Sequence, residues 1–474
     1  MHAIAQLPLS RVTDMNSTLL WLDGQPITLG RFISQARVLA QQLPTRARVI
    51  VLCNTPQLFM LAFVAALLRE HTSLLPPNRL AHTLTYLARN YSDCYVLADH
   101  ADDALSATQA GLPHRLLSEQ DLSVSNVDTE HMPSLPGALL AAVLFTSGST
   151  GESQAIHKHW HTLVRGAAAN ARASLNYTLD LNTTLPANQG PDIVVPAIVG
   201  TVPCQHSYGL ETMIMLPLQG YASVAGERPF YPSDVQRVLT AVPAPRVLVT
   251  TPVHLRALTE AGSALPSLNA IWSATAPLSV DLATRAEQLF HAPMHEIFGC
   301  TEVGTCATRR TTHTDIWTLL PEFALQPQSD QAPAQLSAAH VEQSYPLQDH
   351  VELLDAMHFR LLGRGADMLN IAGKRASLTD LNQRLLSIPG VIDGVIFLPD
   401  AANSAEAGLQ RTAALVVAPT LDREQVFAAL RELIEPAFLP RPLFLVPALP
   451  RNEVAKLPRH ALLNLLAQLE HAHG

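Results

Sequence analysis

The chain has 474 residues, 48% of them hydrophobic and 15% charged, with a formal net charge of -9. This composition is typical of a folded globular protein, and the negative charge offers no basic field for nucleic acid or an anionic membrane surface. Residues 1–21 lack the basic and apolar stretches of a signal peptide. The longest apolar run, residues 58–68, is far shorter than the ~20 residues that span a bilayer, and it predicts a buried helix.

Short β-rich runs alternate with longer amphipathic ones through most of the chain. Strands alternating with helices predict an α/β fold with largely parallel sheets flanked by helices. The stretch 326–344 is rich in Gln, Ala, Ser and Pro, and its poor periodicity predicts a surface connection. Strands are expected at residues 48–53, 94–99, 138–146, 193–199, 246–250, 270–273 and 295–299, and helices at 57–69, from about 160, at 254–261 and at 280–290.

The glycine-rich segment 363–366 marks the expected domain boundary. Residues 1–363 would form a large N-terminal domain, and residues 364–474 a smaller α+β domain of ordinary size. In the smaller domain we expect helices at 378–386, 424–434 and the C-terminus, and strands at 394–398, 413–418 and 443–446.

The cysteines and histidines show no pattern of a disulfide framework or a metal site. No two of the five cysteines have C-x-x-C spacing, and an odd number without pairing argues for a reduced, cytoplasmic protein. His157, His159 and His161 alternate next to Lys158, which could suggest a metal, but we interpret them as the polar surface of a loop or helix.

The strongest local signal is TSGSTG at residues 146–151, directly after a predicted strand. Glycines and small hydroxyl residues let backbone N–H and O–H donors approach an anion closely. The same letters would suit a flexible turn, and the Walker pattern G-x-x-x-x-G-K-[ST] is absent. The candidate phosphate contacts are Thr146, Ser147, Gly148, Ser149, Thr150 and Gly151.

This loop resembles the phosphate loop of the adenylate-forming superfamily of AMP-dependent synthetases and ligases. Residues 273–278 (SATAPL) resemble that family's adenine-lining segment, and residues 298–302 (FGCTE) resemble its Tyr-Gly-x-Thr-Glu motif. The resemblance implies that Phe298 covers the adenine, that Thr301 contacts a phosphate during catalysis and that Glu302 binds magnesium. The implied nucleotide contacts in these segments are Ala274, Thr275, Ala276, Phe298, Gly299 and Cys300.

A second pair of residues matches the ribose site of that family. Asp349 stands where its ribose-binding aspartate is expected, and Arg364 follows with the matching spacing. The resemblance implies that Asp349 accepts hydrogen bonds from both ribose hydroxyls and that Arg364 adds a rigid cationic fork.

The C-terminal region carries two more matches. Residues 363–375 resemble the hinge segment and the loop after it, with Gly365 and Ala366 at the hinge and Arg375 as a further nucleotide contact. Residues 450–459 (PRNEVAKLPR) resemble the terminal motif, which makes Lys456 the implied catalytic lysine for the adenylation step.

Some positions depart from the family pattern. Gln154 stands in place of the usual phosphate-loop lysine. Lys158 could supply that charge to the pyrophosphate, or it could be a solvated lysine at the start of a helix. Ala366 stands where an Asp or Lys hinge is common, and Ala455 replaces the glycine before the catalytic lysine.

The acyl pocket is implied by residues 202–209 (VPCQHSYG), which resemble the segment that flanks the acyl group. His206 is the candidate catalytic and substrate contact. Tyr208 either contacts the substrate or packs in the core, and Gly299 would also border the substrate. Leu210 and the turns after strands 246–250 and 270–273 would complete the pocket.

The resemblance implies adenylation of a carboxylic acid with ATP and Mg²⁺, followed by acyl transfer to a thiol. The compact chain and residues 151–160 (GESQAIHKHW) resemble small ligases of bacterial xanthomonadin and aryl-polyene pigment pathways, which load hydroxybenzoate-type acids onto an acyl carrier protein. An aryl- or acyl-CoA ligase that uses free CoA shares every ATP motif. A nucleotide-binding pseudoenzyme is the third alternative, because Gln154 and Ala366 depart from the pattern.

Overall fold

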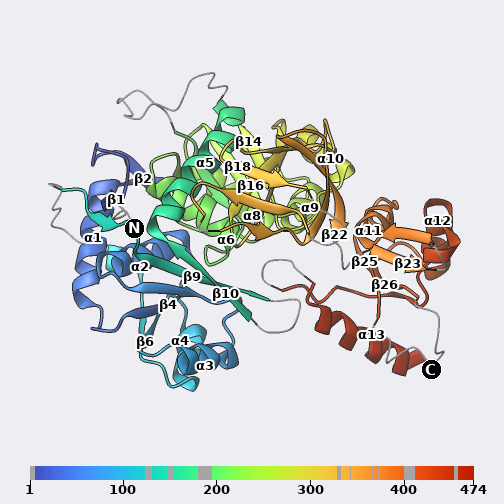
Figure 1. Cartoon of the computed structure of the whole chain (residues 1–474), viewed down its shortest axis with the longest axis horizontal. Helices are drawn as coiled ribbons and strands as arrows, with labels where there is room; N and C mark the ends of the chain where they lie inside the picture. The colour runs from blue at the N-terminus through green and yellow to red at the C-terminus, as the bar shows by residue number, and fades with distance from the viewer. Residues whose placement is uncertain are drawn as a thin grey trace.

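A computed structural model describes residues 6–122, 131–147, 153–179, 195–327, 333–341, 343–364, 368–371, 374–399, 411–452 and 457–473. Two large sheets with their helices form the main body, and the elements after residue 368 lie beside it (Figure 1). The predicted α/β fold is confirmed, and both large sheets are mixed, with parallel strands at their centres and antiparallel pairs at their edges. No helix in the described part of the chain is long and apolar enough to cross a membrane.

The first sheet has six strands in the order β10-β9-β5-β4-β6-β7. All neighbouring pairs are parallel except β9 with β10. The strands are β4 (Arg48–Leu52), β5 (Thr72–Leu75), β6 (Cys94–Ala98), β7 (His114–Leu116), β9 (Leu140–Ser147) and β10 (Ser153–His159), and the helices are α1 (Leu29–Gln42), α2 (Pro56–Leu68), α3 (Ala81–Asn90) and α4 (Ala101–Gln109).

Helix α2 lies between the two large sheets and confirms the buried helix expected at its apolar run. A helix that is apolar on every side must be buried on every side, and all but its last residue are buried. The core cluster that contains α2 also includes Val49 of the first sheet and Ile198 of the second.

The second sheet has eleven strands in the order β21-β22-β17-β16-β15-β14-β13-β11-β12-β2-β3. Its central pairs from β2 to β15 are parallel, and its outer pairs are antiparallel. The strands are β2 (Thr18–Leu22), β3 (Gln25–Thr28), β11 (Ala197–Gly200), β12 (Ser223–Ala225), β13 (Arg246–Thr250), β14 (Ala270–Ser273), β15 (Met294–Cys300), β16 (Gly304–Arg309), β17 (Trp317–Leu319), β21 (Asp349–Leu353) and β22 (His358–Arg364).

The helices linked to this sheet and the smaller elements complete the body. The helices are α5 (Trp160–Leu179), α6 (Ser207–Gly209), the π-helix η2 (Leu210–Met215), α7 (Leu216–Leu218), α8 (Pro232–Ala241), α9 (Pro252–Glu260) and α10 (Val280–Phe290); β1 (Gln6–Pro8) pairs with β8 (Ser134–Pro136), and η1 (Glu119–Leu122) is a short 3-10 helix.

Two expectations about secondary structure were wrong. The histidine-rich segment is strand β10, antiparallel to β9, rather than a loop or helix surface. The stretch expected to be a surface connection contains β19 (Gln335–Ala338), which pairs with β18 (Phe323–Gln326) and β20 (Tyr345–Pro346). Leu336 of β19 is 1% exposed and belongs to the core, so this short strand is held by packing that a low local periodicity does not reveal.

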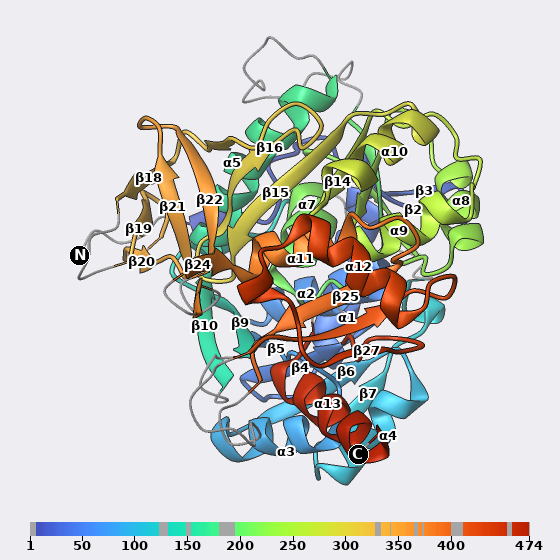
Figure 2. The same ribbon diagram turned by 90° about the vertical axis from the view of Figure 1, so that its right-hand side faces the viewer.

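The C-terminal elements have cores of their own. Two hydrophobic clusters contain only residues beyond 368, centred on β26 and on α13. In Figure 2 these elements lie in front of the body, and Arg256 of α9 donates a hydrogen bond to the Ile392 carbonyl among them. The elements are β23 (Met368–Ile371), β24 (Lys374–Ser377), α11 (Leu378–Leu386), β25 (Asp393–Phe397), β26 (Ala413–Val417), α12 (Arg423–Leu433), η5 (Pro436–Phe438), β27 (Leu443–Leu445) and α13 (Arg459–His473).

Candidate active site

The predicted phosphate loop falls between two paired strands. β9 ends at Ser147 and β10 begins at Ser153, and these two residues are register partners. Thr146 and Ser147 belong to β9; Gly148, Ser149, Thr150 and Gly151 lie outside the described residues. The β9–β10 hairpin is on the side of the body nearest the C-terminal elements (Figure 1).

Thr301 and Glu302 lie in the turn that joins β15 to β16. The register shifts after Phe298, so that Gly299 pairs with Thr305 and Cys300 with Gly304. A Cβ at Gly299 would come within 2.3 Å of the Gly304 carbonyl oxygen. Glycine is therefore required by close backbone packing at this turn, and the Glu302 side chain, which is half-buried, is carried at its tip.

Lys158 is buried rather than solvated at a helix start. It lies within β10 with 4% exposure, and its Nζ donates a 2.9 Å hydrogen bond to the carbonyl oxygen of Glu302. Burial lowers the pKa of Lys158, whereas Glu211, Cys300 and Glu302 act in the opposite direction. The described structure thus joins Lys158 to the Glu302 turn, and its role toward pyrophosphate stays a prediction.

The predicted adenine segment follows β14 at the neighbouring strand end. Ala274 is buried, and Thr275 and Ala276 are half-buried. Thr275 has a φ of 79°, which is an unusual backbone conformation for a β-branched residue. Strained residues persist where the surrounding structure fixes them, often in functional sites. The left-handed backbone of Thr275 therefore singles it out as a candidate functional residue of this segment.

The ribose pair implied by the family resemblance consists of neighbours in the structure. Asp349 begins β21 and Arg364 ends β22, and the two are direct partners in the antiparallel register. Phe298 is half-buried and packs beside Trp317 and Phe359, with ring centroids 5.4 and 5.9 Å away. The same sheet thus carries the predicted adenine, ribose and magnesium residues on, or directly after, β14, β15, β21 and β22.

A small, mainly apolar pocket joins the acyl segment to the adenine segment. It is lined by His206 and Tyr208 from one and by Thr275 from the other. The turn after β13 contributes as expected, through Thr251 and His254. Burial lowers the pKa of His254 to about 4, so its ring is neutral near pH 7, and its Nδ1 lies 3.0 Å from the Thr251 hydroxyl.

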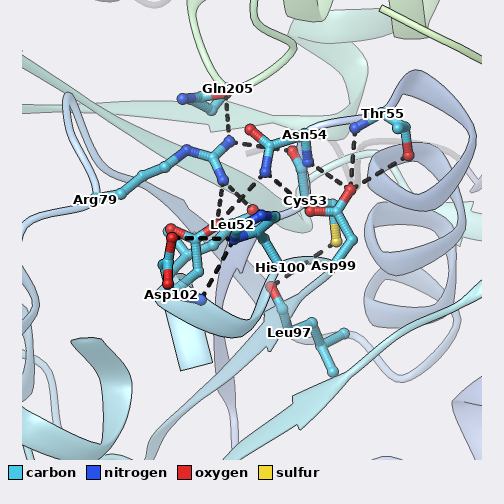
Figure 3. Close-up of polar contacts among 11 residues, drawn as sticks. Leu52, Cys53, Asn54, Thr55, Arg79, Leu97, Asp99, His100, Asp102 and Gln205 are labelled. Carbon is cyan, nitrogen blue, oxygen red and sulfur yellow. Dashed lines mark hydrogen bonds and ion pairs between the residues drawn. The ribbon is translucent and has the colours of Figure 1, made fainter. Parts of the chain in front are cut away.

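A polar cluster supports the acyl segment from the first sheet (Figure 3). Asp99, at the carboxyl end of β6, accepts hydrogen bonds from the backbone N–H groups of Asn54 and Thr55 at 2.7 and 3.1 Å. Arg79 pairs with Asp103 at 2.8 Å and lies 3.4 Å from the Gln205 side-chain oxygen. Because Gln205 precedes His206, this cluster connects the two large sheets next to the pocket.

A larger cleft lies between α1 and residues 115–121. It is at the β7 edge of the first sheet, whereas β9 and β10 form the opposite edge. None of the predicted site residues lines this cleft.

For several predicted site residues the described structure gives no contact with the residues around the pocket and the Glu302 turn. Lys456, Gly365 and Ala366 lie outside the described residues. Arg375 belongs to β24, where it pairs with Asn370.

Glu211 was missed by the sequence analysis. Its carboxylate lies under the β15–β16 turn and accepts hydrogen bonds from the Thr305 backbone N–H at 2.9 Å and from the Thr305 hydroxyl at 2.7 Å. The available signal was an acidic residue within the apolar stretch LETMIMLPL, residues 210–218. Buried acids are rare unless they are paired or hydrogen-bonded.

Comparison with known proteins identifies the family. Residues 30–332, well over half of the chain, match the family described as AMP-binding enzyme. The chain belongs to this family. The adenylate-forming resemblance of the ordered motifs is thereby confirmed.

One curated relative matches part of this AMP-binding enzyme. The 4-coumarate–CoA ligase of Rhodobacter capsulatus is 30% identical over 281 residues, which cover 57% of this chain. The match spans 65% of the relative's own length, slightly less than two thirds.

Solved structures share the fold over nearly the whole chain. ATP-bound MatB of Rhodopseudomonas palustris superposes with a TM-score of 0.78 at 17% identity, covering 98% of this chain and 100% of that one. The o-succinylbenzoate CoA synthetase of Bacillus subtilis, in complex with its acyl-adenylate, gives 0.76 at 16% identity, with 97% and 98% covered. An anthranilate CoA ligase in complex with anthranoyl-AMP gives 0.76 at 14% identity, with 96% and 95% covered.

Proposed function

We propose that this protein adenylates an aryl carboxylic acid with ATP and transfers the acyl group to a thiol. The observation that carries the proposal is the meeting of the acyl and adenine segments, where His206 and Thr275 line one pocket of about 10 Å³ that must widen to admit an acid. An acid held there would have its carboxylate close to a nucleotide bound along the ends of β14 and β15. Family membership supports the same reaction class.

The pocket favours an acid with a ring hydroxyl. The Tyr208 hydroxyl and the Thr275 Oγ1 are buried without a hydrogen-bond partner among the described residues. Burial raises the pKa of Tyr208 well above its usual value, so the phenol keeps its proton. Buried polar groups need partners, and a hydroxybenzoate-type substrate would supply one within a mainly apolar pocket.

The residues present fit magnesium held jointly with the nucleotide. Among the described residues, no three His, Cys, Asp or Glu side chains form a group that could hold a metal ion. Magnesium commonly binds through one or two carboxylates together with substrate phosphates, and Glu302 provides such a carboxylate at the turn. The ion would supply charge neutralisation and Lewis acidity.

In the first step a carboxylate oxygen of the acid attacks the α-phosphorus of ATP, which forms an acyl-adenylate and releases pyrophosphate. Positioning and charge stabilisation account for most catalysis of this kind. Thr301 and the phosphate loop would contact the phosphates, and Asp349 with Arg364 would hold the ribose. Lys456 would stabilise the developing charge as a mobile cation.

In the second step a thiol attacks the acyl carbon, forming a thioester and releasing AMP. We propose that residues 364–474 form a mobile domain that pivots at Gly365 and Ala366 between the steps, because hinge changes need only a few backbone angles. The acceptor we propose is the phosphopantetheine thiol of an acyl carrier protein in a cytoplasmic pigment pathway. All five cysteines are free, which agrees with a reduced compartment.

Free CoA is the second candidate acceptor. It is favoured by the similarity to a relative described as 4-coumarate–CoA ligase. A pseudoenzyme is disfavoured by the retained Glu302 and by the pairing of Asp349 with Arg364.

The experiment is pyrophosphate release across a panel of acids: benzoates with 3- and 4-hydroxyls, unsubstituted benzoate, cinnamates, and short- to medium-chain fatty acids. Each acid is assayed without acceptor, with CoA and with a phosphopantetheinylated carrier protein. We expect the strongest release with a hydroxybenzoate, accelerated by the carrier protein. Acceleration by CoA alone would establish the CoA ligase, and no release with any acid would reject adenylation of these classes.

Tyr208→Phe tests the substrate assignment. Removing the hydroxyl should raise KM for the preferred hydroxybenzoate by about tenfold, the loss of one hydrogen bond of about 1.5 kcal/mol, and leave unsubstituted benzoate nearly unchanged. An equal effect on both acids would show that Tyr208 serves packing only.

A further inference from the structure

The turn that carries Thr301 and Glu302 is bonded at two positions, residues 302 and 305, by the buried charged residues Lys158 and Glu211. We propose that Lys158 and Glu211 are positioning residues that fix this turn for magnesium-nucleotide binding and couple it to the acyl pocket. The inference rests on the proposed function for the role of Glu302. It goes beyond that function because neither residue would touch the nucleotide.

Glu211 holds the turn at residue 305. One carboxylate oxygen accepts hydrogen bonds from the Thr305 N–H and hydroxyl at 2.9 and 2.7 Å. Asn170 of α5 donates to the same hydroxyl at 3.2 Å. A Cβ at Gly304, where φ is 86°, would come within 2.5 Å of the Glu211 carboxylate. The carboxylate therefore fits closely under the backbone that leads out of the turn.

Lys158 holds the turn at residue 302. Its ammonium donates to the Glu302 carbonyl oxygen at 2.9 Å, so the lysine fixes the backbone of the very residue proposed to bind magnesium. The turn is thus bonded through its backbone at residues 302 and 305. Neither of these hydrogen bonds involves the Glu302 carboxylate.

The second Glu211 oxygen leads to the acyl pocket. It accepts a 3.1 Å hydrogen bond from the Ser207 hydroxyl, and Ser207 lies between the pocket residues His206 and Tyr208. Glu211 itself is in the π-helix η2, a rare element that is frequent at functional sites. One carboxylate therefore connects the acyl segment directly to the Glu302 turn.

The energetics argue against a purely structural explanation. Burying a lysine and a glutamate costs free energy, and an apolar replacement of similar shape is often as stable or more so. A satisfied polar network instead fixes a single geometry. Residues that orient metal ligands from behind change affinity or activity by 10–100-fold when they are substituted, and we expect an effect of that size here.

The test uses the full-length protein with Lys158→Met and Glu211→Gln, which keep side-chain size and remove the charge. Hydrogen exchange of the amides at residues 300–306 is measured without nucleotide, and ATP affinity is measured by calorimetry with and without Mg²⁺. The matched control is Arg246→Met, which also removes a cation that binds backbone carbonyls, those of Leu239 and Val242, at the far end of β13.

We expect at least tenfold faster exchange at the turn and at least tenfold weaker ATP binding with Mg²⁺ in both variants. Binding without Mg²⁺ should change much less, and Arg246→Met should leave the turn unaffected. Unchanged exchange at residues 300–306, or equal weakening with and without Mg²⁺, would overturn the proposal. Thr305→Val, which removes one hydroxyl of the network, repeats the test if Lys158→Met does not fold.

The two proposals can fail separately. If the wild-type protein binds no ATP, the proposed function is rejected. Hydrogen exchange at residues 300–306 in the variants would still test whether Lys158 and Glu211 hold the turn. Normal acid-dependent pyrophosphate release in variants with unaltered exchange would reject only the positioning role.

Discussion

At the scale of single residues, Glu302 is the proposed magnesium ligand, and its backbone carbonyl accepts a hydrogen bond from Lys158. Glu302→Gln keeps the size and the turn contacts but removes the charge. We expect the Mg²⁺ concentration needed for half-maximal pyrophosphate release to rise at least tenfold, because a neutral amide is a poorer ligand for this hard cation. Mg²⁺ titrations at saturating ATP measure the effect. An unchanged Mg²⁺ requirement would exclude Glu302 as a ligand.

Lys456 lies outside the described residues, and its role is inferred from the family motif alone. Lys456→Ala should reduce acyl-adenylate formation by about 100-fold or more, since a preorganised cation at developing charge contributes on that order. Thioester formation from a supplied acyl-adenylate should fall far less. Single-turnover assays of the two half-reactions separate these effects, and equal losses in both would contradict the assigned role.

The residues of the candidate site were proposed from the order of family motifs, whereas the contacts that hold them could not be predicted. The partners Asp349 and Arg364 were proposed from the family resemblance, and the structure pairs them in one antiparallel register. Lys158 was expected to act on pyrophosphate, which stays a prediction, or to be solvated, which is wrong because it is buried against Glu302. That contact joins residues 144 positions apart, and no local pattern reports such a pairing.

At the scale of elements, runs of apolar residues located the parallel strands well. β13 and β14 begin and end at the expected residues, because buried parallel strands are continuous apolar runs. β10 was missed because its sequence, SQAIHKH, is mostly polar. Its buried residue is a lysine, whereas the buried positions of a strand are usually apolar. The short antiparallel strands β16 and β17 give equally weak signals, because their stability comes from cross-strand neighbours.

The β15–β16 hairpin depends on glycine at position 304. Gly304→Ala combines a left-handed φ with a Cβ 2.5 Å from the Glu211 carboxylate. Gly262→Ala is the matched control, because its φ is 59° and nothing lies within 4 Å of the added Cβ. We expect the control to lose about 1 kcal/mol of unfolding free energy from strain and Gly304→Ala to lose about 2–3 kcal/mol. Urea unfolding measures both, and equal losses would show that Glu211 readily moves aside.

At the scale of the whole molecule, motif order indicated the family and the fold class. It did not indicate which distant segments contact one another. The second sheet reaches back to pair β12 with β2, and Arg256 meets Ile392 among the C-terminal elements. Such long-range contacts depend on packing that is shared by distant segments. The boundary at residues 363 and 364 stays a prediction, supported by the separate cores beyond residue 368.

The stability of the main body should depend on pH through buried neutral histidines. His295 is 8% exposed, and burial, followed by nearby Arg310, lowers its pKa from 6.5 to about 4. Between these values the unfolded chain binds the extra proton, so stability is fully present above about pH 6.5 and is lost as the pH falls toward 4. At pH 5 this one histidine should lower the free energy of unfolding by about 1–2 kcal/mol relative to pH 7.5.

Fluorescence of the four tryptophans reports the main body alone, because Trp21, Trp160, Trp272 and Trp317 all precede residue 363. Urea unfolding followed in this way at pH 7.5 and 5.0 compares wild type with His295→Gln. The difference between the two pH values should be smaller in the variant by about 1–2 kcal/mol, because glutamine takes up no proton. The comparison within each protein cancels any general destabilisation by the substitution. An identical pH difference would mean that His295 has the same pKa in the folded and unfolded chains.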